Sequence, residues 1–183
     1  MTKSELRMLI KKRASTFSYF SESSAAICDK IINSPQFLSA SVILAYMALP
    51  DEADLTEVIH NALAQRKRVY IPKVIPENDT LEFYRYSPSD IATGSFNIQE
   101  PTSTKESDLF CPETESEPTL VLVPGRAFTR DGKRLGRGKG HYDKYLTRLN
   151  KQAGIAGICL QFQLVGDLPA DEHDIRMDFI FQE

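Results

Sequence analysis

Residues 120–149 read LVLVPGRAFTRDGKRLGRGKGHYDKYLTRL. The run 120–123 is apolar and is followed by a Pro-Gly pair, a pattern typical of a strand that is buried on both faces. An Asp-Gly turn signal at 131–132 and three alternating glycines come next, and apolar residues recur at helical spacing from His141 to Leu149. The stretch therefore predicts a buried strand, a glycine-rich loop and a helix that begins directly after the loop.

The predicted loop has the properties of an anion-binding site. Gly136, Gly138 and Gly140 alternate with basic residues, and glycines allow backbone conformations in which several N–H groups converge on one anion. A helix start adds further free N–H groups. Residues 126–148 carry a net charge of +6, whereas the whole chain carries −3 and the remainder therefore −9. This concentration of positive charge favours a small polyanion as ligand.

The loop matches neither standard nucleotide-binding motif. Five residues separate Gly132 from Gly138, where the Walker motif has four, and Lys139 is followed by Gly140 instead of Ser or Thr. The dinucleotide motif requires a different spacing of its glycines. Charge and glycine content alone thus indicate an anion-binding loop without naming the ligand, and a solvated loop without a ligand remains an alternative.

The run PGRAFTRDGKRLGRGKGHYDKYL at 124–146 resembles the signature of 5-formyltetrahydrofolate cyclo-ligase, also called methenyltetrahydrofolate synthetase. Order and spacing agree over more than twenty residues. Two positions depart from the family pattern. Arg126 lies where the family usually has a small or apolar residue, and His141 lies where it usually has the first tyrosine of a Tyr-Tyr-Asp sequence that belongs to the folate site.

Other parts of the chain extend this resemblance. A Lys and an Arg spaced four apart near the N-terminus contact ATP in the family, and Lys3 and Arg7 match that spacing; without the resemblance they indicate a solvated helix face. The sequence GSFNIQEP at 94–101 resembles a family turn, with Phe96 and Asn97 inside it. Glu100 in this turn is either a site residue or a structural carboxylate.

Hydrophobic periodicity predicts the remaining elements. The expected elements are helices at 2–20 and 21–32, the first residue of the second helix being its cap, a strand at 41–49, a helix from Asp54 or Thr56, strands at 68–74, 81–86, 154–160 and 177–181, and a solvated surface loop at 102–118. The strand, helix and strand within 41–74 indicate a parallel sheet. We therefore predict an α/β fold, a single three-layer domain over 1–183 with a mainly parallel central sheet flanked by helices.

Composition limits the class of protein. A chain of 183 residues with 42% hydrophobic and 26% charged residues is long enough for one domain with a sizeable core. Cys28, Cys111 and Cys159 are odd in number and form no CxxC pair, so neither a disulfide framework nor a zinc site is indicated. The first residues lack the basic-then-apolar layout of a signal peptide, and the sequence has no apolar run of ~18 residues that could span a bilayer. We expect a cytoplasmic monomer that does not bind membranes.

The resemblance implies a reaction. A cyclo-ligase converts 5-formyltetrahydrofolate to 5,10-methenyltetrahydrofolate while ATP becomes ADP and phosphate, with ATP and Mg²⁺ as the cofactors. Phosphorylation of the formyl oxygen makes it a good leaving group for ring closure. The protein mainly positions the substrates and neutralises charge.

The resemblance also assigns site residues. ATP-binding positions are Lys3, Arg7, Arg134, Leu135, Gly136, Arg137, Gly138, Lys139, Gly140, His141 and Tyr142. Substrate-binding positions are Met47, Glu52, Arg137, Lys139 and His141, of which Arg137 and Lys139 are also the catalytic pair. Asp143 and Asp174 match the magnesium positions. On the residues alone, Glu52 is an ordinary loop carboxylate, and Asp143 is a first-turn carboxylate favoured by the helix dipole.

Two other classes of function are open to the sequence. The basic loop with its neighbouring aromatic residues Phe128, Tyr142 and Tyr145 has the composition of a nucleic-acid patch. The acidic remainder of the chain argues against that interpretation. A phosphosugar or coenzyme A binder, or a folate binder without ATP turnover, would keep the same fold and loop.

Overall fold

The computed structural model describes residues 1–94, 99–169 and 171–183. The helices are α1 (Lys3–Thr16), α2 (Phe20–Ile32), α3 (Pro35–Ser39), α4 (Thr56–Ala64) and α5 (His141–Leu146), with short 3₁₀ helices at Glu106–Asp108 and Gln161–Gln163. The strands are β1 (Val42–Leu44), β2 (Arg68–Ile75), β3 (Thr80–Arg85), β4 (Ile91–Thr93), β5 (Gln99–Pro101), β6 (Thr119–Val123), β7 (Ala127–Phe128), β8 (Arg134–Leu135), β9 (Ala153–Cys159) and β10 (Phe179–Gln182).

Six of the described strands form a central sheet in the order β10-β9-β6-β1-β2-β3. Neighbouring strands are parallel from β10 to β2, and β3 runs antiparallel to β2 at one edge. β1 and β2 are joined through α4 and pair in parallel register, so the predicted strand, helix and strand unit is confirmed. The predicted mainly parallel sheet is confirmed with it.

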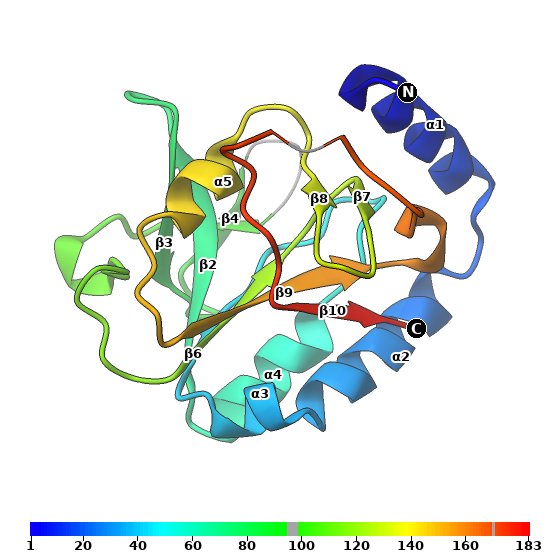
Figure 1. Cartoon of the computed structure of the whole chain (residues 1–183). Coiled ribbons are helices and arrows are strands. Elements are labelled where there is room, and N and C mark those ends of the chain that lie inside the picture. Colours follow the sequence, from blue (N-terminus) through cyan, green and yellow to red (C-terminus); the bar gives the residue numbers. More distant parts are fainter. Residues whose placement is uncertain (95–98, 170) are drawn as a thin grey trace.

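Helices cover both faces of this sheet (Figure 1). One core cluster joins α2, α3 and α4 to one face, through residues such as Ile27, Phe37 and Val58. A second cluster packs Tyr145 and Leu146 of α5 on the opposite face. All five residues of β6 are buried, as its apolar run predicts. The arrangement is the predicted α/β fold in three layers.

Helix α1 stands apart from these layers, beside the β7–β8 hairpin (Figure 1). A capping box fixes its start, because the Thr2 hydroxyl accepts from the Glu5 amide and the Glu5 carboxylate accepts from the Thr2 amide. Leu6 and Ile10 bury their side chains in a cluster that includes Leu135 of β8. The N-terminal helix is thereby held against the segment that carries the glycine-rich loop.

Some predicted boundaries were wrong. The first helix ends at Thr16 instead of residue 20, and the second begins at Phe20, with Tyr19 and not Ser21 at its N-cap. β1 is shorter than the predicted strand 41–49. The chain leaves the sheet after Leu44 to form a loop.

Three further predicted boundaries also shift. The signature helix ends at Leu146 instead of 149. The last strand is β10, two residues shorter at its start than predicted and one longer at its end. The loop 102–118 is not wholly solvated: Phe110 is buried, and its amide donates to the Phe83 carbonyl. The last part of the predicted family turn at 94–101 forms β5, which pairs with β4, whereas Phe96 and Asn97 of that turn lie outside the described residues.

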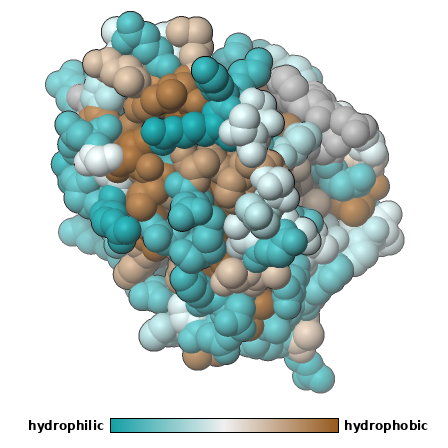
Figure 2. Space-filling model, turned by 90° about the vertical axis from the view of Figure 1, so that its right-hand side faces the viewer, coloured by the Kyte–Doolittle hydropathy of each residue, from teal (hydrophilic) through white to brown (hydrophobic). Residues whose placement is uncertain are grey.

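Large hydrophobic side chains that remain exposed lie at scattered positions, among them Met8, Tyr19 and Phe179. The face seen in Figure 2 is covered largely by hydrophilic residues, with hydrophobic ones gathered in one area. None of the helices in the described part of the chain has the length and apolar character needed to cross a membrane.

Candidate active site

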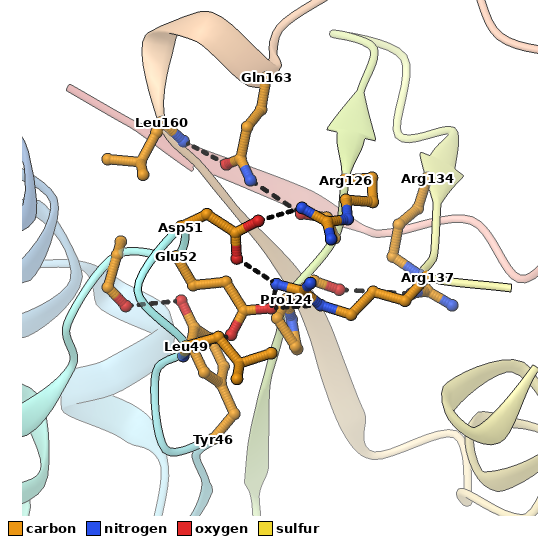
Figure 3. Close-up of polar contacts among 12 residues, drawn as sticks. Tyr46, Leu49, Asp51, Glu52, Pro124, Arg126, Arg134, Arg137, Leu160 and Gln163 are labelled. Carbon is orange, nitrogen blue, oxygen red and sulfur yellow. Dashed lines mark hydrogen bonds and ion pairs between the residues drawn. The ribbon is translucent and has the colours of Figure 1, made fainter. Parts of the chain in front are cut away.

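The candidate site lies where the parallel strands end. After β1 the chain enters the loop that carries Asp51 and Glu52, and after β6 it continues directly into Arg126. Gln163 follows β9 in a 3₁₀ helix. In Figure 3 these segments converge and their side chains point toward one another. This edge is where α/β sheets bind their ligands.

Gln163 ties two of the strand ends together. Its side-chain carbonyl accepts from the Leu160 amide at 2.8 Å, and its side-chain amide donates to the Gly125 carbonyl, also at 2.8 Å (Figure 3). The residue is only 3% exposed. Because a buried amide with both ends satisfied has one favourable orientation, Gln163 fixes the start of the loop after β6.

Arg137 of the glycine-rich loop reaches across to the loop after β1. Its Nε and Nη2 donate to Glu52 Oε1 at 3.0 and 2.7 Å, and Nη2 also donates to Asp51. The second oxygen of Asp51 accepts from Arg126 (Figure 3). Burial would raise the pKa of Asp51, but the bonds and charges of Arg137 and Arg126 hold this pKa below its usual value. The structure thus brings the predicted Glu52 and Arg137 together.

The glycine-rich loop rests on α1. Gly138 and Gly140 have φ values of 109° and 70°, in the region that favours glycine. Arg7 Nε donates to the Gly136 carbonyl at 2.9 Å, and its guanidinium carbon lies 3.6 Å from the place of a Cβ on Gly138. The predicted Arg7 and the loop are therefore in contact, although they are far apart in the sequence.

The basic residues of the site differ in how their charge is neutralised. Arg126, Arg134 and Arg137 each form an ion pair with a carboxylate. Lys139 is exposed and has no hydrogen-bond or ion-pair partner within the described ranges, and Arg7 binds a carbonyl but no carboxylate there. Lys139 of the loop and Arg7 of α1 thus have charges that are available to an anionic ligand.

Arg134 lies beneath the loop, and its side chain is only 3% exposed. Its Nη2 donates to Asp143 at 2.8 Å and its Nη1 to the Pro124 carbonyl at 3.3 Å. The guanidinium carbon lies 5.7 Å from the centre of the Tyr142 ring, and burial raises the pKa of that tyrosine. Arg134 therefore joins the start of α5 to the end of β6. Leu135 beside it packs against α1.

Lys3 binds the C-terminal segment. Its ammonium group donates to Asp171 at 2.8 Å and to Asp174 at 2.6 Å. Burial would raise the pKa of Asp174, but the bond to Lys3 keeps this pKa below its usual value. The amide of Ile175 donates to Asp143 at 3.5 Å, so the two predicted magnesium carboxylates lie on adjoining segments.

Asp143 and Asp174 fit magnesium as part of a donor set. Each already has a cationic partner, and within the described residues no group of three or more His, Cys, Asp or Glu residues is placed to hold a metal ion. Magnesium is usually held by one or two carboxylates together with phosphate oxygens and water. Two carboxylates on adjoining segments beside the glycine-rich loop would suit an ion that arrives with a nucleotide.

A cleft of about 860 Å³ opens next to the loop after β1. Met47 and Glu52 both line it, so the structure brings these two predicted substrate-binding residues to one cavity. Residues of α2 and α4 also line it, among them Phe20, Ser24 and His60. Because Glu52 also binds Arg137, it connects the cleft to the glycine-rich loop.

His141 is the first residue of α5, and its Nε2 lies 3.1 Å from Asp79 Oδ1 in the turn between β2 and β3. Asp79 has a positive φ of 52°, as its place in a tight turn requires. The contact connects the end of the glycine-rich loop to the β2–β3 hairpin. No pattern in the sequence indicates that this hairpin lies beside the loop.

The sequence did not identify Asp51 or Gln163 as site residues, and it marked Arg126 only as a departure from the family pattern. A signal for Asp51 existed, because it is adjacent to Glu52 at the end of a predicted strand. The pairing of these carboxylates with two arginines depends on the fold and leaves no local pattern in the chain.

Replacing Arg134 with methionine is expected to lower the free energy of unfolding by about 2 kcal/mol. The loss of a buried ion pair usually costs more, but Asp143 is 23% exposed and water will solvate part of its charge. Arg148→Met is the matched control, because Arg148 also has carboxylate partners and an aromatic ring beside it but is 35% exposed. The control should cost less than about 1 kcal/mol. Urea unfolding measures both, and equal losses would contradict the structural role of Arg134.

A profile of the 5-formyltetrahydrofolate cyclo-ligase family matches residues 1–183. The 5-formyltetrahydrofolate cyclo-ligase of Mus musculus is 27% identical over 170 residues, which cover 87% of this chain and 82% of that protein. The solved structure of a 5,10-methenyltetrahydrofolate synthetase from Mycoplasma pneumoniae superposes with a TM-score of 0.77 at 26% identity, covering 100% of this chain and 99% of that one.

The NMR structure of the 5,10-methenyltetrahydrofolate synthetase of Aquifex aeolicus gives a TM-score of 0.79 at 32% identity, covering 98% of this chain and 89% of that one. The match of the family profile to the whole chain agrees with the resemblance seen in the signature at 124–146. The chain belongs to the 5-formyltetrahydrofolate cyclo-ligase family.

Proposed function

We infer that this protein is a 5-formyltetrahydrofolate cyclo-ligase, which converts 5-formyltetrahydrofolate to 5,10-methenyltetrahydrofolate and consumes ATP. The observation that carries this inference is the contact between Glu52 and Arg137, because it joins a cleft large enough for a folate to the glycine-rich loop. A reaction between a folate and a nucleotide phosphate requires these two places to adjoin.

The formyl oxygen of the substrate is a poor leaving group. Transfer of the terminal phosphoryl group of ATP to this oxygen gives ADP and a phosphorylated formyl group. The nitrogen at position 10 then attacks the formyl carbon and loses its proton to solvent, the bond from that carbon to the phosphorylated oxygen breaks, and phosphate leaves. No side-chain nucleophile is needed, so the protein acts by positioning the reactants and offsetting phosphate charge.

The residues divide between the two reactants. Lys139, Arg7 and the N–H groups of 136–140 bind the phosphates of ATP, because their charges and donors are available there. Met47 and Glu52 bind the folate in the cleft. Arg137 lies between the two reactants and stabilises the charge that develops during transfer.

The remaining predicted residues support these contacts. Arg134 and Tyr142 hold the start of α5, and Lys3 holds the C-terminal segment beside it. His141 holds the end of the glycine-rich loop. Asp143 and Asp174 would hold magnesium, which supplies neutralisation of phosphate charge when it is bound.

We further propose that residues 1–183 act as one domain and as a monomer on small-molecule substrates, with no nucleic acid as partner. The charge of −9 outside residues 126–148 supports the absence of a nucleic-acid partner, because it would repel a long polyanion. A reducing cytoplasm would keep the free thiols of Cys28, Cys111 and Cys159 reduced.

The test mixes the purified protein with 5-formyltetrahydrofolate, ATP and magnesium and follows the near-ultraviolet absorbance of the methenyl product. We expect a rise that requires both ATP and magnesium. Absence of the rise, with folate or ATP still bound in calorimetry, would contradict the proposed reaction. It would indicate a folate binder without turnover, or a binder of another phosphorylated ligand such as a phosphosugar or coenzyme A.

A further inference from the structure

Four charged side chains form one connected group at the junction of the cleft and the glycine-rich loop. Asp51 binds Arg126 through one carboxylate oxygen and Arg137 through the other, and Arg137 also binds Glu52 (Figure 3). The group is electrically balanced. The lowered pKa of Asp51, which burial opposes and the two arginines cause, keeps its carboxylate ionised.

Arg137 cannot use its full charge on a substrate while it is held this way. Its Nε and Nη2 both donate to carboxylates, which leaves Nη1 as the only nitrogen of the guanidinium with no carboxylate partner among the described residues. Turning the whole group to an anionic ligand therefore requires the release of at least one of these bonds. That release would leave Asp51 and Glu52, which are adjacent in sequence, with two negative charges near the incoming anion. These two uncompensated negative charges would oppose both the movement of Arg137 away from them and the binding of the anionic ligand.

Arg126 is placed to compensate one of these charges, and its backbone is held in place. Its amide donates to the Leu135 carbonyl at 2.7 Å, and the carbonyl of the preceding Gly125 is held by Gln163. The Arg126 side chain is only 19% exposed. Asp51 therefore keeps a cationic partner when Arg137 leaves, and only the Glu52 charge remains uncompensated.

We propose that Arg126 and Asp51 are positioning residues for Arg137: Asp51 bridges the two guanidinium groups, and Arg126 neutralises Asp51 so that Arg137 is released to the phosphates of the nucleotide. The proposal rests on the proposed function. It assigns a role to two residues outside the predicted site, and it treats Arg126 as a compensating charge instead of a direct ligand.

The test measures binding of the non-hydrolysable β,γ-imido analogue of ATP, with magnesium, by calorimetry. In Arg126→Gln, Asp51 is left with Arg137 as its cation and holds it more tightly, so we expect binding to weaken about tenfold. Arg126→Lys restores the charge and should recover most of this loss. In an Asp51→Asn background there is no charge to neutralise, so adding Arg126→Gln should change binding by less than about twofold.

This suppression separates the proposal from two simpler explanations. If Arg126 attracted the nucleotide directly, its replacement would weaken binding equally in both backgrounds. If Arg126 were only structural, Arg126→Gln would lower the melting temperature, and it would weaken binding of the analogue in the Asp51→Asn background as well. Arg68→Gln is the matched control, because it removes an ion pair with Glu115 at the start of β2, and it should bind as the wild type does.

The outcomes also separate this proposal from the proposed function. Equal weakening in both backgrounds, or wild-type binding by a folded Arg126→Gln protein, would overturn the role of Arg126 while product formation by the wild type still stands. Failure of the wild-type protein to bind the nucleotide analogue would overturn the proposed function and this role together. Weakening that vanishes in the Asp51→Asn background would support the role.

Discussion

Replacing Lys139 with alanine is expected to lower kcat/KM for the ATP-dependent reaction by about a hundredfold to a thousandfold. Lys139 lies between Gly138 and Gly140, whose positive φ values shape the loop, and it is exposed. Within the described residues its ammonium group has no carboxylate to neutralise it. Its charge is therefore fully available to phosphate, unlike that of Arg137, which two carboxylates share.

Lys144→Ala is the matched control for this prediction. It removes the same charge from an exposed position on α5, five residues further along the chain. The control should retain kcat/KM within about twofold, because exposed charges away from the bound anion are screened. Steady-state rates at varied ATP concentration measure both variants. Similar losses in the two variants would mean that net charge, and not the position of Lys139, determines the rate.

The fold could be predicted to a large extent because its signals are local. The apolar run of β6 is buried throughout, and the alternation of strand and helix between 41 and 74 gave the parallel pairing of β1 with β2. Strand and helix ends were less predictable. The apolar character of 41–49 continues past Leu44, where the chain turns away so that the Leu49 amide can donate to Glu52.

The candidate site was predictable only in part. The loop residues of the site were predicted because the signature at 124–146 resembles that of the family. Their spacing alone would not have identified the ligand. The partners of these residues come from elsewhere: Arg137 binds Glu52, 85 positions away, and Lys3 binds Asp174, 171 positions away. No local pattern encodes such pairs. Candidate cations could therefore be predicted from the sequence, but which of them a carboxylate neutralises depends on the fold.

Replacing Gly132 with alanine is expected to lower the free energy of unfolding by about 3 kcal/mol. Gly132 has a φ of 87°, which costs a residue with a side chain about 1–2 kcal/mol. An added Cβ would also lie 2.3 Å from the carbonyl oxygen of Met177. That atom belongs to the backbone, so it cannot move aside as the end of a flexible side chain could.

The contact at Gly132 also matters for the site. Its carbonyl accepts from the Met177 amide at 2.8 Å, and its own amide donates to Thr129 at 3.1 Å, so this turn joins the β7–β8 hairpin to the segment before β10. The hairpin places Arg134 at its end. We therefore expect Gly132→Ala to weaken binding of the ATP analogue as well as stability.

Gly166→Ala is the control, because Gly166 has no positive φ and an added Cβ there would meet no atom within 4 Å. It should change the free energy of unfolding by less than about 0.5 kcal/mol or raise it slightly, since alanine restricts the unfolded chain more than glycine does. Urea unfolding of both variants measures the difference. If Gly132→Ala were as stable as Gly166→Ala, the close approach of this turn to Met177 would be wrong, and with it the placement of the hairpin that holds Arg134 under the loop.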